Sequence, residues 1–207
     1  MALLLLDNRI QDLEFILRCL KSNVTPVLFD FKRDSFESIT EKIPEKRYTH
    51  LGILKSPRLS DTYCLMESFG ESVLKDVQRY DPALDTWTSF HLLVELCVSR
   101  LGVRCLDMIE YFPTRDLDYL SYQWELPIRY SSSPLGKTAN GYNWTLNGES
   151  LLHDYFTKDI ESYPYTIGYT HEYRNEYPHE YRNEYPIRPI QVPYEKQILF
   201  RILHNKK

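Results

Sequence analysis

The chain has 207 residues, of which 43% are hydrophobic and 26% are charged, and its net charge is −4 at pH 7. This composition is typical of a soluble globular protein, and a negative net charge gives no electrostatic reason to expect nucleic acid as a partner. The opening apolar run ends at Asp7, which makes it too short for a signal peptide or for the roughly 20 residues of a membrane span. We therefore expect a cytoplasmic protein with neither a membrane nor a nucleic-acid partner.

The first quarter of the chain alternates between strand and helix patterns. A continuous apolar run at residues 2–6 predicts a buried strand, and apolar residues at helical spacing predict a helix at 9–21. Residues 24–31 predict a second strand. Asp34, followed three residues later by a glutamate, predicts a capping box for a second helix. Residues 48–54 predict a third strand.

The alternation resumes after a less regular stretch at residues 55–83. Asp85 caps the strongest predicted helix, which has a wide apolar stripe and ends at Gly102. The stripe consists of Trp87, Phe90, Leu93, Val94, Cys97, Val98 and Leu101. The remaining predicted elements are a strand at 103–109, a helix at 117–124, a strand at 128–130, loops at 131–150 and a helix at 151–156.

This alternation predicts an α/β fold of three layers, with a mostly parallel twisted sheet and helices on both faces, as in Rossmann-like proteins. We expect one globular domain at 1–160, an arm at 161–194 and a docked C-terminal segment at 195–207. Ligands of such sheets bind at the carboxyl ends of the strands. The loops at that edge are residues 7–8, 30–34, 55–59, 110–115 and 131–137.

The C-terminal part is rich in tyrosine. The octapeptide His-Glu-Tyr-Arg-Asn-Glu-Tyr-Pro occurs twice in succession, at 171–178 and 179–186. Tyrosines recur every four residues, and in an extended chain this even spacing places their rings on one face. We interpret the arm as a surface for contact with its own domain or with a partner, while a duplication in a tolerant disordered tail fits the pattern equally. The candidate contact residues are Tyr169, Tyr173, Tyr177, Tyr181, Tyr185 and Phe200.

Residues 131–138 read Ser-Ser-Ser-Pro-Leu-Gly-Lys-Thr after a short predicted strand. The spacing is that of a phosphate-binding loop with serine in place of the first glycine. The candidate ligand-binding residues are Ser131, Gly136, Lys137 and Thr138. Turn residues follow Thr138, and Pro134 removes one amide donor, so both features argue against a phosphate cradle. We expect no cofactor.

The cysteines and histidines give weak catalytic signals. Cys64 or Cys105 could form a thiol–imidazole dyad with His50. A cysteine inside an apolar segment is, however, more typical of a small buried thiol. His171 and His179 are eight residues apart, which is not the spacing of a metal site. We therefore expect no catalytic residue and no metal.

Five runs carry a family resemblance: residues 5–13, 34–39, 49–54, 106–109 and 131–146, the last ending in Gly-Tyr-Asn-Trp-Thr-Leu. They resemble an uncharacterised bacterial domain of large repeat-bearing surface proteins, with relatives encoded by large DNA viruses. That domain is distantly similar to the caspase–haemoglobinase fold. Peptidases of that fold carry His-Gly after the third strand and Cys after the fourth. Those positions here are Ser56-Pro57 and Glu110-Tyr111, so the resemblance implies a caspase-like domain without the dyad.

These features predict a non-enzymatic interaction or structural protein that self-associates, as a homodimer, through its aromatic arm and C-terminus. The resemblance implies a viral protein, for which host cytoplasm, nucleus or virion are the expected locations. One alternative is a cysteine- or serine-type hydrolase with an unrecognised site at the carboxyl ends of the strands. The other is a nucleotide-binding protein that uses the loop at 131–138.

Overall fold

The computed structural model describes residues 1–30, 32–56, 89–111, 117, 121–122, 124–131 and 133–167. The Asp85 cap, Trp87 of the apolar stripe and nearly all of the less regular stretch at 55–83 lie outside the described residues. So do the duplicated octapeptide and the C-terminal segment. Among the described helices, none is long and apolar enough to cross a membrane.

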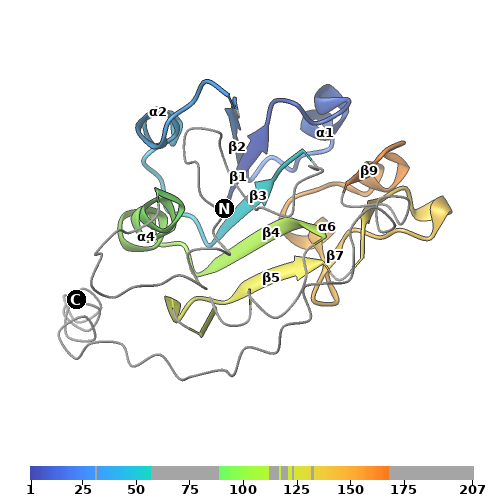
Figure 1. Cartoon of the computed structure of the whole chain (residues 1–207). Coiled ribbons are helices and arrows are strands. Elements are labelled where there is room, and N and C mark those ends of the chain that lie inside the picture. Colours follow the sequence, from blue (N-terminus) through green and yellow to red (C-terminus); the bar gives the residue numbers. More distant parts are fainter. Residues whose placement is uncertain are drawn as a thin grey trace, which may run out of the picture.

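A five-stranded parallel sheet forms the centre of the described structure (Figure 1). Its strands are β1 (Ala2–Asp7), β2 (Val24–Phe29), β3 (His50–Leu54), β4 (Cys105–Tyr111) and β5 (Ile128–Ser131). They lie in the order β2-β1-β3-β4-β5, and every neighbouring pair is parallel. This order is one of the two common ones of doubly wound α/β sheets. The predicted α/β class and parallel sheet are confirmed.

Strand β1 is the best buried strand, because it lies between β2 and β3 and all six of its residues are buried. Strand β2 is an edge strand of the sheet, and its Pro26 and Leu28 are exposed. Proline has no backbone N–H, so an edge is the position where a sheet tolerates it. The Lys42 ammonium donates to the backbone oxygen of Leu28 over 3.5 Å. Proline and lysine are residues that blunt a sheet edge against further pairing.

Strand β5 forms the other edge of the sheet, and a tight turn at Asn147 is hydrogen-bonded to it. The backbone N–H of Tyr130 donates to the Asn147 side chain over 2.7 Å, and the Asn147 N–H donates to the Tyr130 oxygen over 2.9 Å. Asn147 has φ 48°, a left-handed conformation that asparagine adopts more readily than most residues. It joins the short strands β7 (Thr145–Leu146) and β8 (Glu149–Ser150). The turn thus occupies both backbone groups of Tyr130.

The first two helices differ in detail from their predicted limits. Helix α1 (Leu13–Arg18) is shorter than the predicted 9–21, because Asp12 before it takes the left-handed conformation with φ 51°. Helix α2 (Phe36–Lys42) is capped by Ser35, whose hydroxyl oxygen accepts the backbone N–H of Ser38, while the Ser38 hydroxyl oxygen accepts the backbone N–H of Ser35. The capping box predicted from Asp34 was therefore wrong by one residue. The Asp34 carboxylate instead accepts hydrogen bonds from the Ser38 hydroxyl, the Lys42 ammonium and the backbone of the preceding loop.

Two hydrophobic clusters line the sheet. One combines Leu3 and Leu5 of β1 with residues of α2 and of helix α4 (Ser89–Leu101). The other combines Leu4 and Leu6 with residues of α1 and of helix α6 (Leu151–Asp154). Alternate residues of one strand thus enter different clusters, as the pleat of a strand requires. Cys19, Cys97 and Cys105 are buried free thiols, as predicted.

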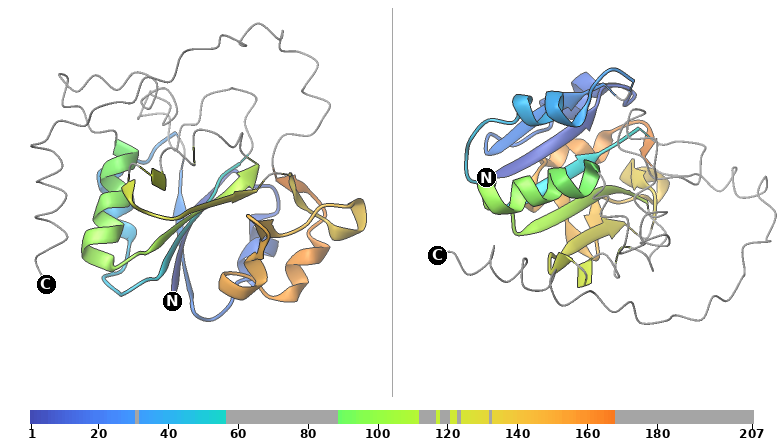
Figure 2. Two further views of the ribbon diagram at one scale, coloured as in Figure 1. Left: turned by 90° about the horizontal axis from the view of Figure 1, so that it is seen from below. Right: turned by 60° about the vertical axis from the view of Figure 1, so that its left-hand side comes forward.

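The second cluster continues to the end of the described chain. It includes Tyr163 and Ile167, which follow the 3₁₀ helix η3 (Lys158–Ser162). The strand β9 (Thr166–Ile167) pairs antiparallel with β6 (Leu135–Gly136). Figure 2 shows this part of the chain, coloured yellow to orange, gathered beside α1. The first residues of the predicted arm therefore pack as part of the folded body.

Gly52 allows a close approach between β3 and the residue that follows α6. A Cβ atom at this position would lie 2.7 Å from Cε1 of Tyr155 and 2.8 Å from Cδ1 of Leu4. The Tyr155 ring is wholly buried, so it has little space into which to retreat. Glycine is the residue that lets the ring lie directly on the strand backbone.

We predict that Gly52→Ala destabilises the fold by about 1–3 kcal/mol, because the added methyl group overpacks the ring. Chemical denaturation measures this free energy of unfolding. The matched comparison is the same substitution in a Tyr155→Ala background, where only the Leu4 side chain remains close to the added methyl group and the cost should be smaller. An equal cost in both backgrounds would show that the ring is not the obstacle.

Candidate functional site

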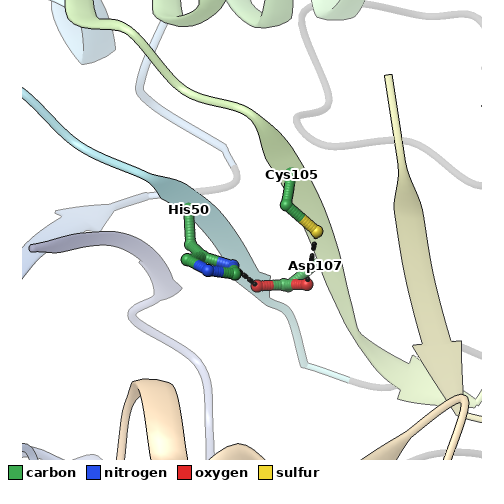
Figure 3. A group of neighbouring side chains, drawn as sticks. All are labelled: His50, Cys105 and Asp107. Atoms are coloured by element: carbon green, nitrogen blue, oxygen red, sulfur yellow. Dashed lines mark hydrogen bonds and ion pairs between the residues drawn. The ribbon is translucent and has the colours of Figure 1, made fainter. Parts of the chain in front are cut away.

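A polar cluster lies on the sheet face that Tyr155 covers. The strand register pairs His50 with Cys105, Gly52 with Asp107, and Asp107 with Arg129. Since side chains alternate along a strand, these residues of β3, β4 and β5 project from one face. Figure 3 shows His50 and Cys105 pointing toward Asp107 from neighbouring strands.

Asp107 is the centre of the cluster, and its side chain is 0% exposed. Arg129 binds it through two nitrogens, with Nε 2.5 Å from Oδ1 and Nη2 2.8 Å from Oδ2. The Tyr155 hydroxyl donates to Oδ2 over 2.6 Å, and Nδ1 of His50 lies 3.1 Å from the same oxygen. The Cys105 thiol lies 3.4 Å from Oδ1. A two-point arginine–carboxylate pair is among the strongest hydrogen-bonded arrangements in proteins.

Arg129 also joins the cluster to the segment that follows the sheet. Its Nη2 lies 2.7 Å from the Asp154 carboxylate at the end of α6, and its Nη1 lies 2.6 Å from Glu149 in β8. The hydrogen bond to Asp107 is the largest of the interactions that raise the pKa of the guanidinium. One side chain of β5 therefore holds β4, β8 and α6 together.

The same contacts set the protonation states of the cluster. Burial alone would raise the pKa of Asp107, but hydrogen bonds from Arg129, His50 and Tyr155 lower it, so the carboxylate is charged. Burial raises the pKa of the Cys105 thiol to about 12, and the nearby Asp107 charge acts in the same direction. Burial likewise raises the pKa of Tyr155. A raised thiol pKa disfavours nucleophilic attack, because the thiolate is the reactive form.

The environment of His50 favours the charged form of its side chain, whereas that of Cys105 and Tyr155 favours the neutral form. The hydrogen bond to Asp107 raises the pKa of the imidazole, burial opposes this, and the charges of Asp107 and Asp154 raise it further. The Nε2 atom lies 3.9 Å from an Asp154 oxygen, and the ring is edge-on to Tyr155 with centroids 6.4 Å apart.

His50, Cys105 and Asp107 are also residue types that ligate transition metals, and their ligand atoms lie within 4.8 Å of one another. The arginine does not fit such a use of the site. Nη2 of Arg129 lies 3.2 Å from Nδ1 of His50 and is bonded to the carboxylate. The guanidinium thus stands where a metal cation would have to bind, and we assign no metal to these residues.

At the carboxyl end of β1, one of the strand ends where ligands were expected, the described polar side chain of Asp7 is used internally. Asp7 at the end of β1 is buried, accepts the backbone N–H of Arg9 over 3.0 Å and forms an ion pair with its guanidinium. It also accepts the backbone N–H of Ser56 over 3.2 Å. Asp7 therefore fastens the loop after β1 to the loop after β3.

The candidate phosphate-binding residues are spread over three elements. Ser131 is the last residue of β5, and its buried hydroxyl donates to the Ser133 backbone oxygen over 2.5 Å. Gly136 pairs with Thr166 as part of β6. Lys137 and Thr138 are exposed at the start of the three-residue 3₁₀ helix η2 (Thr138–Asn140). A phosphate cradle normally has a longer α-helix at this point, and the nucleotide-binding alternative stays a prediction.

Sequence reasoning named His50 and Cys105 as a possible pair, and the structure does bring them together. They are the first residues of β3 and β4. They therefore lie at the amino ends of these strands, whereas ligands were expected at the carboxyl ends. Asp107 and Arg129 were missed. The available signal was an acid inside the predicted strand at 103–109 and an arginine inside the predicted strand at 128–130. The proposed contact tyrosines and Phe200 lie outside the described residues.

No protein-family model, curated protein or solved structure matches the chain. The resemblance to the bacterial and viral domain stays a prediction.

We predict that Asp107→Asn destabilises the fold by about 3 kcal/mol or more, because it leaves a largely buried guanidinium without its main counter-charge. Denaturant titration of the two proteins at pH 7 measures the difference. Glu45→Gln is the control, because Glu45 pairs with Arg100 at 3.5 Å while both side chains are mostly exposed. That change should cost less than about 1 kcal/mol. Similar costs for the two variants would contradict the assigned role of burial.

We also predict that Cys105 resists alkylation in the native protein. A thiol pKa of about 12 leaves roughly a thousandfold less thiolate than a free cysteine has at neutral pH. Iodoacetamide labelling followed by mass spectrometry of the Cys105 peptide gives the rate, and the denatured chain supplies the reference. Native labelling as fast as that reference would overturn the assignment and favour a reactive thiol.

Proposed function

We propose that the chain is a non-enzymatic interaction or structural module that self-associates as a homodimer. The observation that carries the first half of this proposal is the pairing within the polar cluster. Asp107, the one carboxylate next to both a cysteine and a histidine in the described part, is bound by Arg129 and Tyr155. Residue types that elsewhere perform catalysis hold elements of the fold together here.

The sheet edges support the view that contact with a partner uses another surface. Pro26 and Lys42 blunt the edge at β2, and Asn147 occupies the backbone groups of Tyr130 at β5. Pairing of an additional strand at either of these positions would have to displace such groups. The aromatic arm and the apolar C-terminal residues are then the favoured contact regions. Large, rigid tyrosine rings supply contact area at low entropic cost.

A cysteine- or serine-type hydrolase is the second candidate, and one observation favours it. His50, Cys105 and Asp107 lie together, as the members of a catalytic triad do. Against it, the carboxylate lies between the ring and the thiol, and the pKa of that thiol is about 12. The alkylation rate of Cys105 separates this candidate from the first.

The finer features of the fold and the origin of the protein are part of the same proposal. The two hydrophobic clusters support a three-layer arrangement with helices on both faces. The strand order supports a Rossmann-like sheet. A viral origin, a cytoplasmic location and a caspase-like ancestry rest on the sequence alone.

We predict that the intact chain sediments as a dimer and that replacing the five arm tyrosines by alanine weakens the dimer roughly tenfold or more. The replaced residues are Tyr169, Tyr173, Tyr177, Tyr181 and Tyr185. Sedimentation velocity over a range of concentrations gives both dissociation constants. Tyr122→Ala is the control, because Tyr122 is 79% exposed outside the arm and its loss should leave the dimer unchanged. A monomeric wild-type chain, or a variant that dimerises equally well, would reject self-association through the arm.

A further inference from the structure

One member of the polar cluster belongs to the residue type that changes charge near neutral pH. An unperturbed imidazole titrates near pH 6.5, so small changes of environment decide whether histidine is charged. The His50 side chain is 24% exposed and lies against the fully buried Asp107. Water can therefore deliver a proton to the ring, while the Asp107 carboxylate against which the ring lies is shielded from solvent.

Both ring nitrogens of His50 face a carboxylate. Nδ1 lies 3.1 Å from Oδ2 of Asp107, and Nε2 lies 3.9 Å from Oδ1 of Asp154. A neutral imidazole has one N–H group and one lone pair, so one of its nitrogens then presents a lone pair to an anion. The protonated ring presents an N–H group to each carboxylate. The two carboxylates therefore favour the charged form.

One cation opposes this preference. Nη2 of Arg129 lies 3.2 Å from Nδ1 of His50, so two positive charges would be close together. The same guanidinium is, however, shared among Asp107, Asp154 and Glu149. Three carboxylates surround one arginine, and a protonated His50 supplies the second cation. The remaining groups that face the ring, the Cys105 thiol and the Tyr155 phenol, have pKa values raised by burial and are uncharged.

We propose that His50 is a proton switch which, when protonated, ties the end of α6 to the amino ends of β3 and β4 through Asp154, and which releases that tie when it loses the proton. The residues that follow Asp154 are hydrogen-bonded to the segment between α1 and β2. The backbone oxygen of Tyr155 accepts the N–H of Lys21, and the Thr157 N–H donates to the oxygen of Cys19. A displacement of Asp154 would thus be transmitted through these hydrogen bonds to the segment between α1 and β2.

The direction of the pH dependence follows from the sign of the shift. The pKa of His50 is raised in the folded protein, so its stabilising effect is fully present below about pH 6.5 and is lost as the pH rises through the folded value. This inference does not depend on self-association, because the titration can be followed in a monomer or a dimer.

Nuclear magnetic resonance of the intact chain tests the switch. The His50 ring signals, assigned with a His50→Gln variant, should titrate with a midpoint above 6.5. The backbone amides of Asp154 and Tyr155 should shift with the same midpoint, whereas the amide of Ile39 in α2 should not. His153→Gln is the matched control, since His153 is an exposed neighbour on α6 and its loss should leave the titration intact. A midpoint at or below 6.5, or α6 amides that ignore it, would overturn the proposal.

A second variant keeps the test open if His50→Gln fails to fold. Asp154→Asn removes the carboxylate that faces Nε2 while leaving the ring and Asp107 in place. The His50 midpoint should then fall to a pH about one unit lower. An unchanged midpoint in Asp154→Asn would mean that the tie to α6 does not exist.

Discussion

Asp107 is a charged side chain with no exposure to water in the middle of a parallel sheet, and this imposes a constraint on everything around it. A buried charge is tolerated only when other groups replace its hydration. Arg129 supplies the counter-charge, and Tyr155 supplies a further hydrogen bond. The tyrosine can reach the carboxylate because β3 has glycine where its ring lies. The positions of β5, α6 and Gly52 are thus linked through one carboxylate.

The same constraint shapes what the site can do. The desolvation that makes Asp107 depend on Arg129 also keeps the Cys105 thiol protonated, so the cysteine next to a histidine is part of the core. His50 differs because it is partly exposed and has carboxylates on two sides. The chemistry that remains in the cluster is the gain and loss of a proton.

The sequence predicted secondary structure correctly where a single physical effect, such as the burial of an apolar run, dominates. The continuous apolar run of β1 predicted a strand buried on both faces, and the alternation of strand and helix patterns predicted a parallel sheet. Local competition was harder to foresee: the left-handed backbone conformation of Asp12 delays the start of α1 to Leu13, and Ser35 replaces Asp34 as the cap of α2. Asp107 and Arg129 are 22 residues apart, and only the strand register reveals that they meet. Both residues also lie away from the carboxyl edge of the sheet, where ligands of such sheets usually bind.

The most direct test of the account is a double-mutant cycle between Asp107 and Arg129. The free energies of unfolding of Asp107→Asn, Arg129→Met and the double variant are compared with that of the parent chain at pH 7. If the two side chains form the central pair of the fold, the double variant should lose less stability than the sum of the single losses, by about 1–3 kcal/mol. Losses that simply add would contradict the account, because they would mean that the two charges do not depend on each other.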